Sequence, residues 1–77
     1  MEIQKKNVRH LAHSGLRLFL MNKIKKHGVQ RTALAVQRAL HLPSTGAFDL
    51  RTLTMLSKGW RRRAYERFKS AVTMHLA

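Results

Sequence analysis

Cysteine is absent from the 77-residue chain, and only three of its residues are acidic. Without cysteine the chain has neither a disulfide framework nor a thiolate zinc site, which fits a reducing compartment. Its longest apolar run, from Leu16 to Met21, is interrupted by Arg17 and is far shorter than the ~20 residues of a membrane span. No cleavable signal sequence follows the charged N-terminus. We therefore expect one small domain without a transmembrane segment, cytoplasmic when made.

The scarcity of acid argues against catalysis. Glu2, Asp49 and Glu66 are the only carboxylate side chains, and glycoside hydrolysis needs two of them across one cleft. Glu2 is terminal, Asp49 is placed to cap a helix, and Glu66 can pair with Arg62 or Arg63.

Histidine and serine add no catalytic or metal site. His10 and His13 lie one helical turn apart, and no third ligand is evident for a metal ion. The serines have no histidine and acid partners in the pattern that would activate a nucleophile. We expect no enzymatic activity, no bound metal and no cofactor.

What the chain has in abundance is positive charge: sixteen lysines and arginines give a formal net charge of +13. Such an excess is tolerated when a polyanion is the usual neighbour. The candidates are nucleic acid, an anionic cell-wall polymer and an acidic membrane. The cations expected to contact it are Lys23, Lys25, Lys26, Arg61, Arg62, Arg63 and Arg67.

The arginine run from Arg61 to Arg63 opens a predicted helix, where positive charge opposes the helix dipole. That placement is easier to understand if an anion lies nearby. A solvated basic face is the alternative interpretation.

Apolar residues recur at helical spacing along the chain. The expected helices cover residues 3–27, Gln30 to His41, Leu50 to Lys58 and Trp60 to Leu76. The last is expected to bury Trp60, Ala64, Phe68 and Val72. The pattern predicts an all-α fold, a compact bundle of three to four helices. Its single domain comprises a basic N-terminal helix (1–28), a helix–loop–helix (29–59) and a basic C-terminal helix (60–77).

Local signals mark the expected helix ends. Cations followed by glycine, at Gly28 and at Gly59, are typical of a helix stop. The residue before a proline avoids the helical region, so Leu42-Pro43 is expected to end the second helix.

The first helix carries a wide apolar stripe. Leu11, Leu18 and Met21 extend it beyond a third of the circumference. This is more apolar surface than a small monomer can cover, so we expect self-association or a protein partner at these three residues.

The loop before the third helix, Ser44 to Thr52, contains residues that suit a helix start. Asp49 is a good N-cap, and Gly46 supplies backbone freedom. Phe48 precedes the cap, where an apolar residue can pack against Leu53 as a hydrophobic staple.

The segment LAVQRALHLPSTGAFDLRTLTML, Leu34 to Leu56, resembles the peptidoglycan-binding-like three-helix domain that accompanies many cell-wall hydrolases. The matching positions are Val36-Gln37 with Leu40, then Thr45 to Asp49, then Thr52 with Met55 and Leu56. The following GWRRRAYERF is similar to a basic, aromatic helix of some phage-type wall hydrolases.

The resemblance implies a fold of that kind and docking onto glycan strands or stem peptides without catalysis. The ligand-binding residues that it implies are Gln37, Thr45, Gly46, Phe48 and Arg51.

Together these observations favour a non-enzymatic module that docks to an anionic cell-envelope polymer. Its source would be a phage, as a small accessory or virion protein that is released at lysis or carried in the particle. The alternatives are a small basic protein that binds DNA or RNA through phosphate-backbone contacts, and a phage protein that binds a host protein. In a helix-turn-helix interpretation Arg51 and Thr52 would lead the recognition helix, but the loop from Leu42 to Phe48 is too long for the usual turn.

Overall fold

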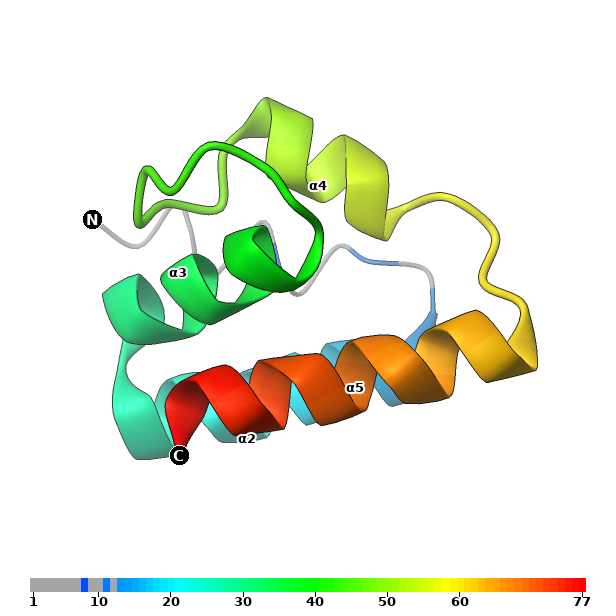
Figure 1. The fold of residues 1–77 in the computed structure, drawn as a ribbon, viewed down its shortest axis with the longest axis horizontal. Helices are drawn as coiled ribbons and strands as arrows, with labels where there is room; N and C mark the ends of the chain where they lie inside the picture. The colour runs from blue at the N-terminus through cyan, green and yellow to red at the C-terminus, as the bar shows by residue number, and fades with distance from the viewer. Residues whose placement is uncertain (1–7, 9–10, 12) are drawn as a thin grey trace.

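The computed structural model describes residues 8, 11 and 13–77, and the part it describes is helical without strands. The helices are α2 (Ser14–His27), α3 (Val29–Ala39), α4 (Leu50–Leu56) and α5 (Arg62–Leu76) (Figure 1). The predicted all-α class is therefore confirmed. Within the described part of the chain, no helix combines the length and apolar character needed to cross a membrane.

The start of α2 differs from the prediction. His13 is extended (φ −75°, ψ 105°), and its Nδ1 accepts a hydrogen bond from the backbone N–H of Leu16 at 3.0 Å. The side chain thus caps the helix, which begins at Ser14. The predicted helix 3–27 is wrong at Leu11 and His13, which are not helical, and its remaining early residues lie largely outside the described ones. Histidine is not among the usual N-cap residues, so His13 itself gave no cap signal.

Gly28 separates α2 from α3 as predicted. Its φ of 93° is left-handed, and its N–H donates to the carbonyl oxygen of Ile24 at 2.7 Å. Lys25, Lys26 and His27 occupy the last turn of α2, where positive charge is favourable to the helix dipole.

The end of α3 lies at Ala39, before the predicted end at His41. His41 has a φ of 58°, and its N–H donates to the carbonyl of Arg38 at 3.2 Å. The N–H of Leu42 reaches the carbonyl of Gln37 at 2.8 Å. These two bonds form a Schellman motif with His41 in the position that usually holds glycine. Backbone hydrogen bonds, rather than Pro43, therefore end this helix.

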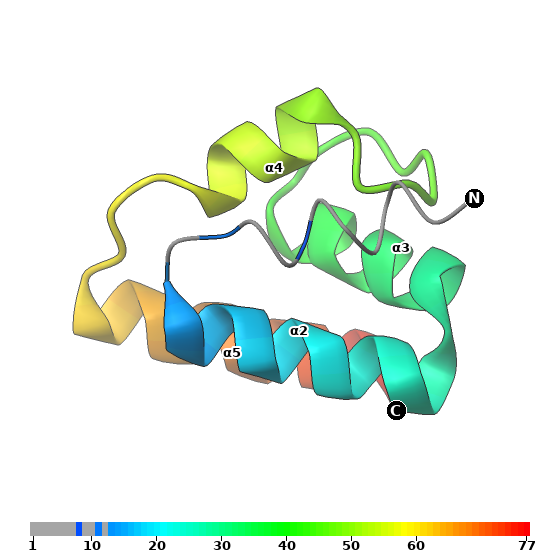
Figure 2. The same ribbon diagram turned by 180° about the vertical axis from the view of Figure 1, so that it is seen from behind.

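α3 is the central element, because it packs against both α2 and α5. Figures 1 and 2 show α2 and α5 running in the same direction along the molecule, with α3 running back across them and α4 beyond it. The largest fully buried apolar side chains are Phe48, Leu16, Leu20, Leu56, Val8, Val36 and Val72. Leu53 packs against this core from α4.

α5 begins at Arg62, with Arg61 as its N-cap, rather than at Trp60. Phe68 and Val72 are buried as predicted, and Trp60 is half-buried. Ala64 was expected in the core and is exposed instead. At the start of α2, Tyr65 packs on His13, with ring centroids 4.7 Å apart, so α5 also contacts the capped end of that helix.

Candidate polyanion-binding surface

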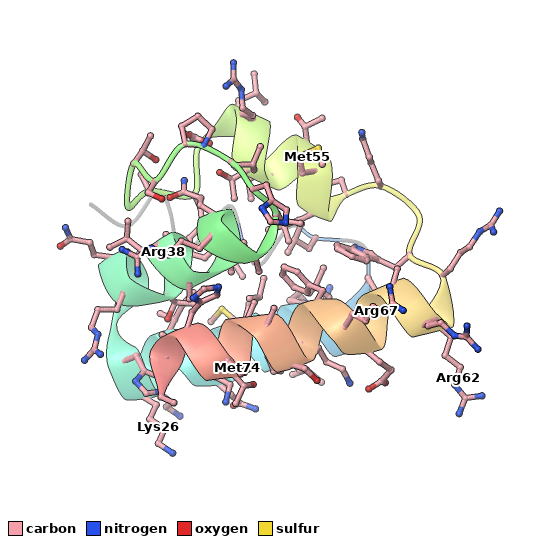
Figure 3. All side chains as sticks on the ribbon, in the orientation of Figure 1. Lys26, Arg38, Met55, Arg62, Arg67 and Met74 are labelled. Carbon is pink, nitrogen blue, oxygen red and sulfur yellow. The ribbon has the colours of Figure 1, made fainter. Side chains whose placement is uncertain are left out.

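The cations expected to bind a polyanion separate into two groups at opposite ends of the molecule. The α2-end cluster consists of Lys23, Lys25 and Lys26, and the α5-start cluster consists of Arg61, Arg62, Arg63 and Arg67. Figure 3 shows Lys26 and Arg62 at opposite ends of the long axis, along which the molecule extends 33 Å. The four arginines are exposed, as are Lys25 and Lys26. These seven cations therefore form two clusters rather than one.

Arg31 also belongs to the α2-end cluster, although it was not among the cations predicted from the sequence. Partial desolvation lowers the pKa of His27, and the positive charges of Arg31, Lys26 and Lys23 lower it further. Arg31 comes from the first turn of α3, across the turn at Gly28, and it is exposed. The predicted helix stop at Gly28 could have indicated Arg31, because the turn there brings the start of α3 back to the end of α2.

The α5-start cluster surrounds a helix N-terminus that has no cap from a side chain. Arg61 makes no capping hydrogen bond through its side chain, and the first turn of α5 contains no acid. The free backbone N–H groups and the guanidinium groups all favour an anion at this end.

The carboxylate of Glu66 does not neutralise this cluster. It pairs with Lys69 at 3.3 Å, so the predicted pairing with Arg62 or Arg63 is wrong. Asp49, the other acidic side chain among the described residues, is bound within the loop. The cations of the α5-start cluster therefore have no carboxylate side chain as partner in the part of the chain that the structure describes.

Three of the five expected ligand-binding residues are buried, namely Gln37, Gly46 and Phe48. Gln37 is fully buried, and the side chain of Phe48 is 1% exposed. The Gln37 side-chain amide lies close to three acceptors: Thr45 Oγ1 at 2.8 Å, the carbonyl of Ala47 at 2.8 Å and Thr52 Oγ1 at 3.0 Å. Gln37 and Phe48 hold the loop against α3, and in this conformation neither offers side-chain surface to a ligand.

Thr45 and Arg51 are exposed beside a small hollow. Its volume is about 90 Å³, well below the roughly 300 Å³ at which ligand pockets usually start. Gly46 is buried, with a φ of 77°, and its N–H donates to Gln37 Oε1 at 3.0 Å. The ligand role of these loop residues stays a prediction.

The three residues expected to meet a partner are not exposed together. Leu11 is buried, Met21 packs against the core, and Leu18 is 62% exposed. The prediction that these residues form exposed apolar surface is therefore wrong for Leu11. Of the three, Leu18 is the most exposed. The partner itself stays a prediction.

The two histidines considered as metal ligands do not form a metal site among the described residues. His13 caps α2, and His10 lies outside the described residues. The described residues contain no group of three or more histidine or acidic side chains that could hold a metal ion.

Comparison of the chain with models of protein families, with curated proteins and with solved structures gave no match. The likeness of Leu34 to Leu56 to wall-binding domains thus rests on its short motif alone.

Proposed function

We propose that the chain is a non-enzymatic module that docks to an anionic polymer of the cell envelope. The observation that carries this proposal is the pair of exposed basic clusters at the two ends of the molecule, without carboxylate side-chain partners in the described part of the chain.

The separation of the clusters favours a polymer over a small anion. The helix α5 runs from the α5-start cluster toward the end of the molecule at which α2 ends (Figure 1). Its 15 residues correspond to about 22 Å at 1.5 Å per residue, so the two clusters are separated by a distance of this order. A single phosphate or carboxylate can reach only one cluster. A strand with repeated negative charges can occupy both, and the second contact then forms at a high effective concentration.

The cell envelope is preferred because of the segment Leu34 to Leu56. The helix–loop–helix in this segment is the arrangement that a peptidoglycan-binding-like domain implies, and it supports the proposal. Stem peptides of peptidoglycan carry carboxylates, which arginine binds through paired hydrogen bonds. A phage accessory or virion protein that works at the wall fits this role.

A nucleic-acid-binding protein is the second candidate, and the start of α5 favours it. Three consecutive exposed arginines at a free helix N-terminus form a good phosphate site. Contacts of this kind bind the backbone without reading the sequence.

Sedimentation with peptidoglycan stripped of teichoic acid separates the two candidates. Salt of about 0.3 M weakens backbone binding to a duplex by orders of magnitude. We expect the full chain to sediment with the wall at this salt, because the loop contacts that the likeness of Leu34 to Leu56 implies are not all ionic, and to release a labelled duplex. Replacing Arg61, Arg62 and Arg63 by glutamine should abolish most duplex binding and reduce wall binding. Lys58→Gln removes one exposed charge outside both clusters and should reduce the binding of either ligand far less than the triple replacement.

The first candidate is contradicted, and the second favoured, if no protein sediments with the wall while a duplex or RNA is still bound at sub-micromolar concentration. Failure to bind either polymer would contradict both.

A further inference from the structure

A groove lies between the end of α3 and the first half of α5, apart from the loop hollow. Its volume is about 580 Å³, and the linker between α4 and α5 closes one side of it. Figure 1 shows the segments that frame it: the C-terminal end of α3, that linker and α5. The groove is lined by Ala39, Leu40, Trp60, Arg61, Arg63, Ala64, Arg67, Phe68 and Ala71.

The floor of the groove is apolar. Ala64, Phe68 and Ala71 follow one another at spacings of four and three, so they share one face of α5. Small side chains at two of these positions leave the space open, because α3 already ends at Ala39. The Trp60 indole N–H donates to the carbonyl of Leu56 at 3.0 Å. Its polar group is therefore satisfied within the protein, and apolar contact is the remaining role for its exposed part.

The rim of the groove is cationic. Arg63 and Arg67 lie one helical turn apart along it, and Arg61 lies at its end. Figure 3 shows Arg67 on the side of α5 toward α3, whereas Arg62 points away from the body of the molecule. An occupant that suits both surfaces has apolar side chains for the floor and carboxylates or phosphates for the rim.

We propose that this groove docks an acidic, amphipathic peptide segment of a partner protein. Its apolar side chains pack on Trp60, Ala64 and Ala71, and its carboxylates pair with Arg63 and Arg67. Apolar anchors in a groove with charged pairs at the edge are a common mode of helix recognition.

A second copy of the chain does not fit this role. It has only three acidic residues, of which Asp49 and Glu66 already have partners within the fold. The floor also suits a peptide better than a nucleobase. Bases stack on open aromatic faces, whereas Trp60 is half-buried and packs on Phe68 with ring centroids 4.9 Å apart.

Fluorescence of Trp60, the only tryptophan of the chain, reports binding directly. The probes are synthetic acidic helical peptides that carry two leucines at helical spacing. Two control peptides have serine in place of both leucines, or glutamine in place of the acids. We expect a saturable change with the first peptides, and affinity lower by about tenfold or more for each control.

Variants of the groove test the same contacts from the protein side. Ala64→Gln places a longer polar side chain in the groove from an exposed position, and Ser70→Gln makes the same kind of change on α5 outside it. Ala64→Gln should lower the affinity for the peptide by about tenfold, whereas Ser70→Gln should leave that affinity unchanged. Arg63→Gln with Arg67→Gln should weaken it to a similar extent. Melting temperatures check that each variant is folded.

The groove shares Arg61, Arg63 and Arg67 with the α5-start cluster of the envelope proposal. Ala64→Gln separates the two proposals, because it keeps every arginine and should leave wall binding unchanged. Equal affinity for the leucine-free peptide would mean that charge alone binds, and would overturn the inference. The absence of any fluorescence response to the peptides would also overturn it. The same holds if a single-stranded oligonucleotide binds at Trp60 more tightly than the peptides do and its affinity is lower for Ala64→Gln.

Discussion

The side-chain Oε1 of Gln37 accepts a hydrogen bond from the backbone N–H of Gly46 at 3.0 Å. The same amide reaches Thr45, Ala47 and Thr52 through its Nε2. One buried glutamine on α3 therefore fixes both the loop and the start of α4.

Replacing Gln37 by alanine should destabilise the protein strongly. The variant leaves the N–H of Gly46 without its acceptor in a buried position, and each unsatisfied buried group costs about 1–3 kcal/mol. We expect the free energy of unfolding in urea to fall by about 2–4 kcal/mol. Gln30→Ala is the matched control, because Gln30 is an exposed glutamine on the same helix whose side chain also lies beside Gly46. A small loss of stability in Gln37→Ala, no larger than that in Gln30→Ala, would show that the Gln37 contacts contribute little.

Asp49 should make the stability depend on acid pH. Its carboxylate accepts hydrogen bonds from the backbone N–H of Thr52 at 2.9 Å and from the Thr52 hydroxyl at 2.7 Å. These bonds, with a smaller contribution from Thr45 and from the charge of Arg51, hold the pKa of Asp49 below its ordinary value of 3.8.

Because the unfolded chain binds this proton more readily, the contribution of Asp49 is fully present above the ordinary pKa. It is lost as the pH falls through the lower pKa of the folded state. Unfolding free energies measured from neutral pH to below pH 3.8 should therefore fall less steeply in Asp49→Asn than in the wild type. Asp49→Ala should cost about 1 kcal/mol at neutral pH through the lost cap. Identical pH profiles would exclude the role of this carboxylate.

Gly28 and Gly59 form a matched pair for a test of backbone strain. A Cβ would meet nothing within 4 Å at either position, but Gly28 has a φ of +93°. Gly28→Ala should lower the free energy of unfolding by about 1–2 kcal/mol through strain alone. Gly59→Ala should be neutral or slightly stabilising. Thermal unfolding of the two variants checks this, and a tolerated alanine at Gly28 would contradict the structure of this turn.

His41 is the non-glycine residue with positive φ in the described part of the chain. His41→Gly removes the cost of a Cβ in this conformation and should raise the free energy of unfolding by about 0.5–1 kcal/mol. Ala39→Gly, at the end of α3, should instead lower it by up to about 1 kcal/mol. A destabilised His41→Gly variant would mean that the imidazole has a contact worth more than the relieved strain.

Residue types with one strong local preference made parts of the fold predictable. Asp49 caps α4, and Gly28 ends α2, as the sequence indicates. His13 and His41 take the positions of a capping residue and of a left-handed glycine, and histidine is common in neither, so both helix ends were misplaced.

Helical spacing also shows which residues share a face, but not how far a neighbouring helix covers that face. Ala64 lies on the same face as Phe68, yet α3 ends too early to cover it, and the groove results. Likewise, nothing in the sequence distinguishes a glutamine that contacts a ligand from one that closes a loop. The burial of Gln37 follows from the path of the loop around it.

Whether one polymer engages both basic clusters at once is tested most directly by ligand length. The affinity of the wild type for long glycan strands with stem peptides is compared with its affinity for a single disaccharide-peptide unit. The comparison is repeated after Lys23, Lys25 and Lys26, or Arg61, Arg62 and Arg63, are changed to glutamine. We expect the wild type to prefer the long strands by about a hundredfold, and each variant to lose most of that preference. A preference that is equally large in the wild type and both variants would show that the two clusters do not act together on one polymer.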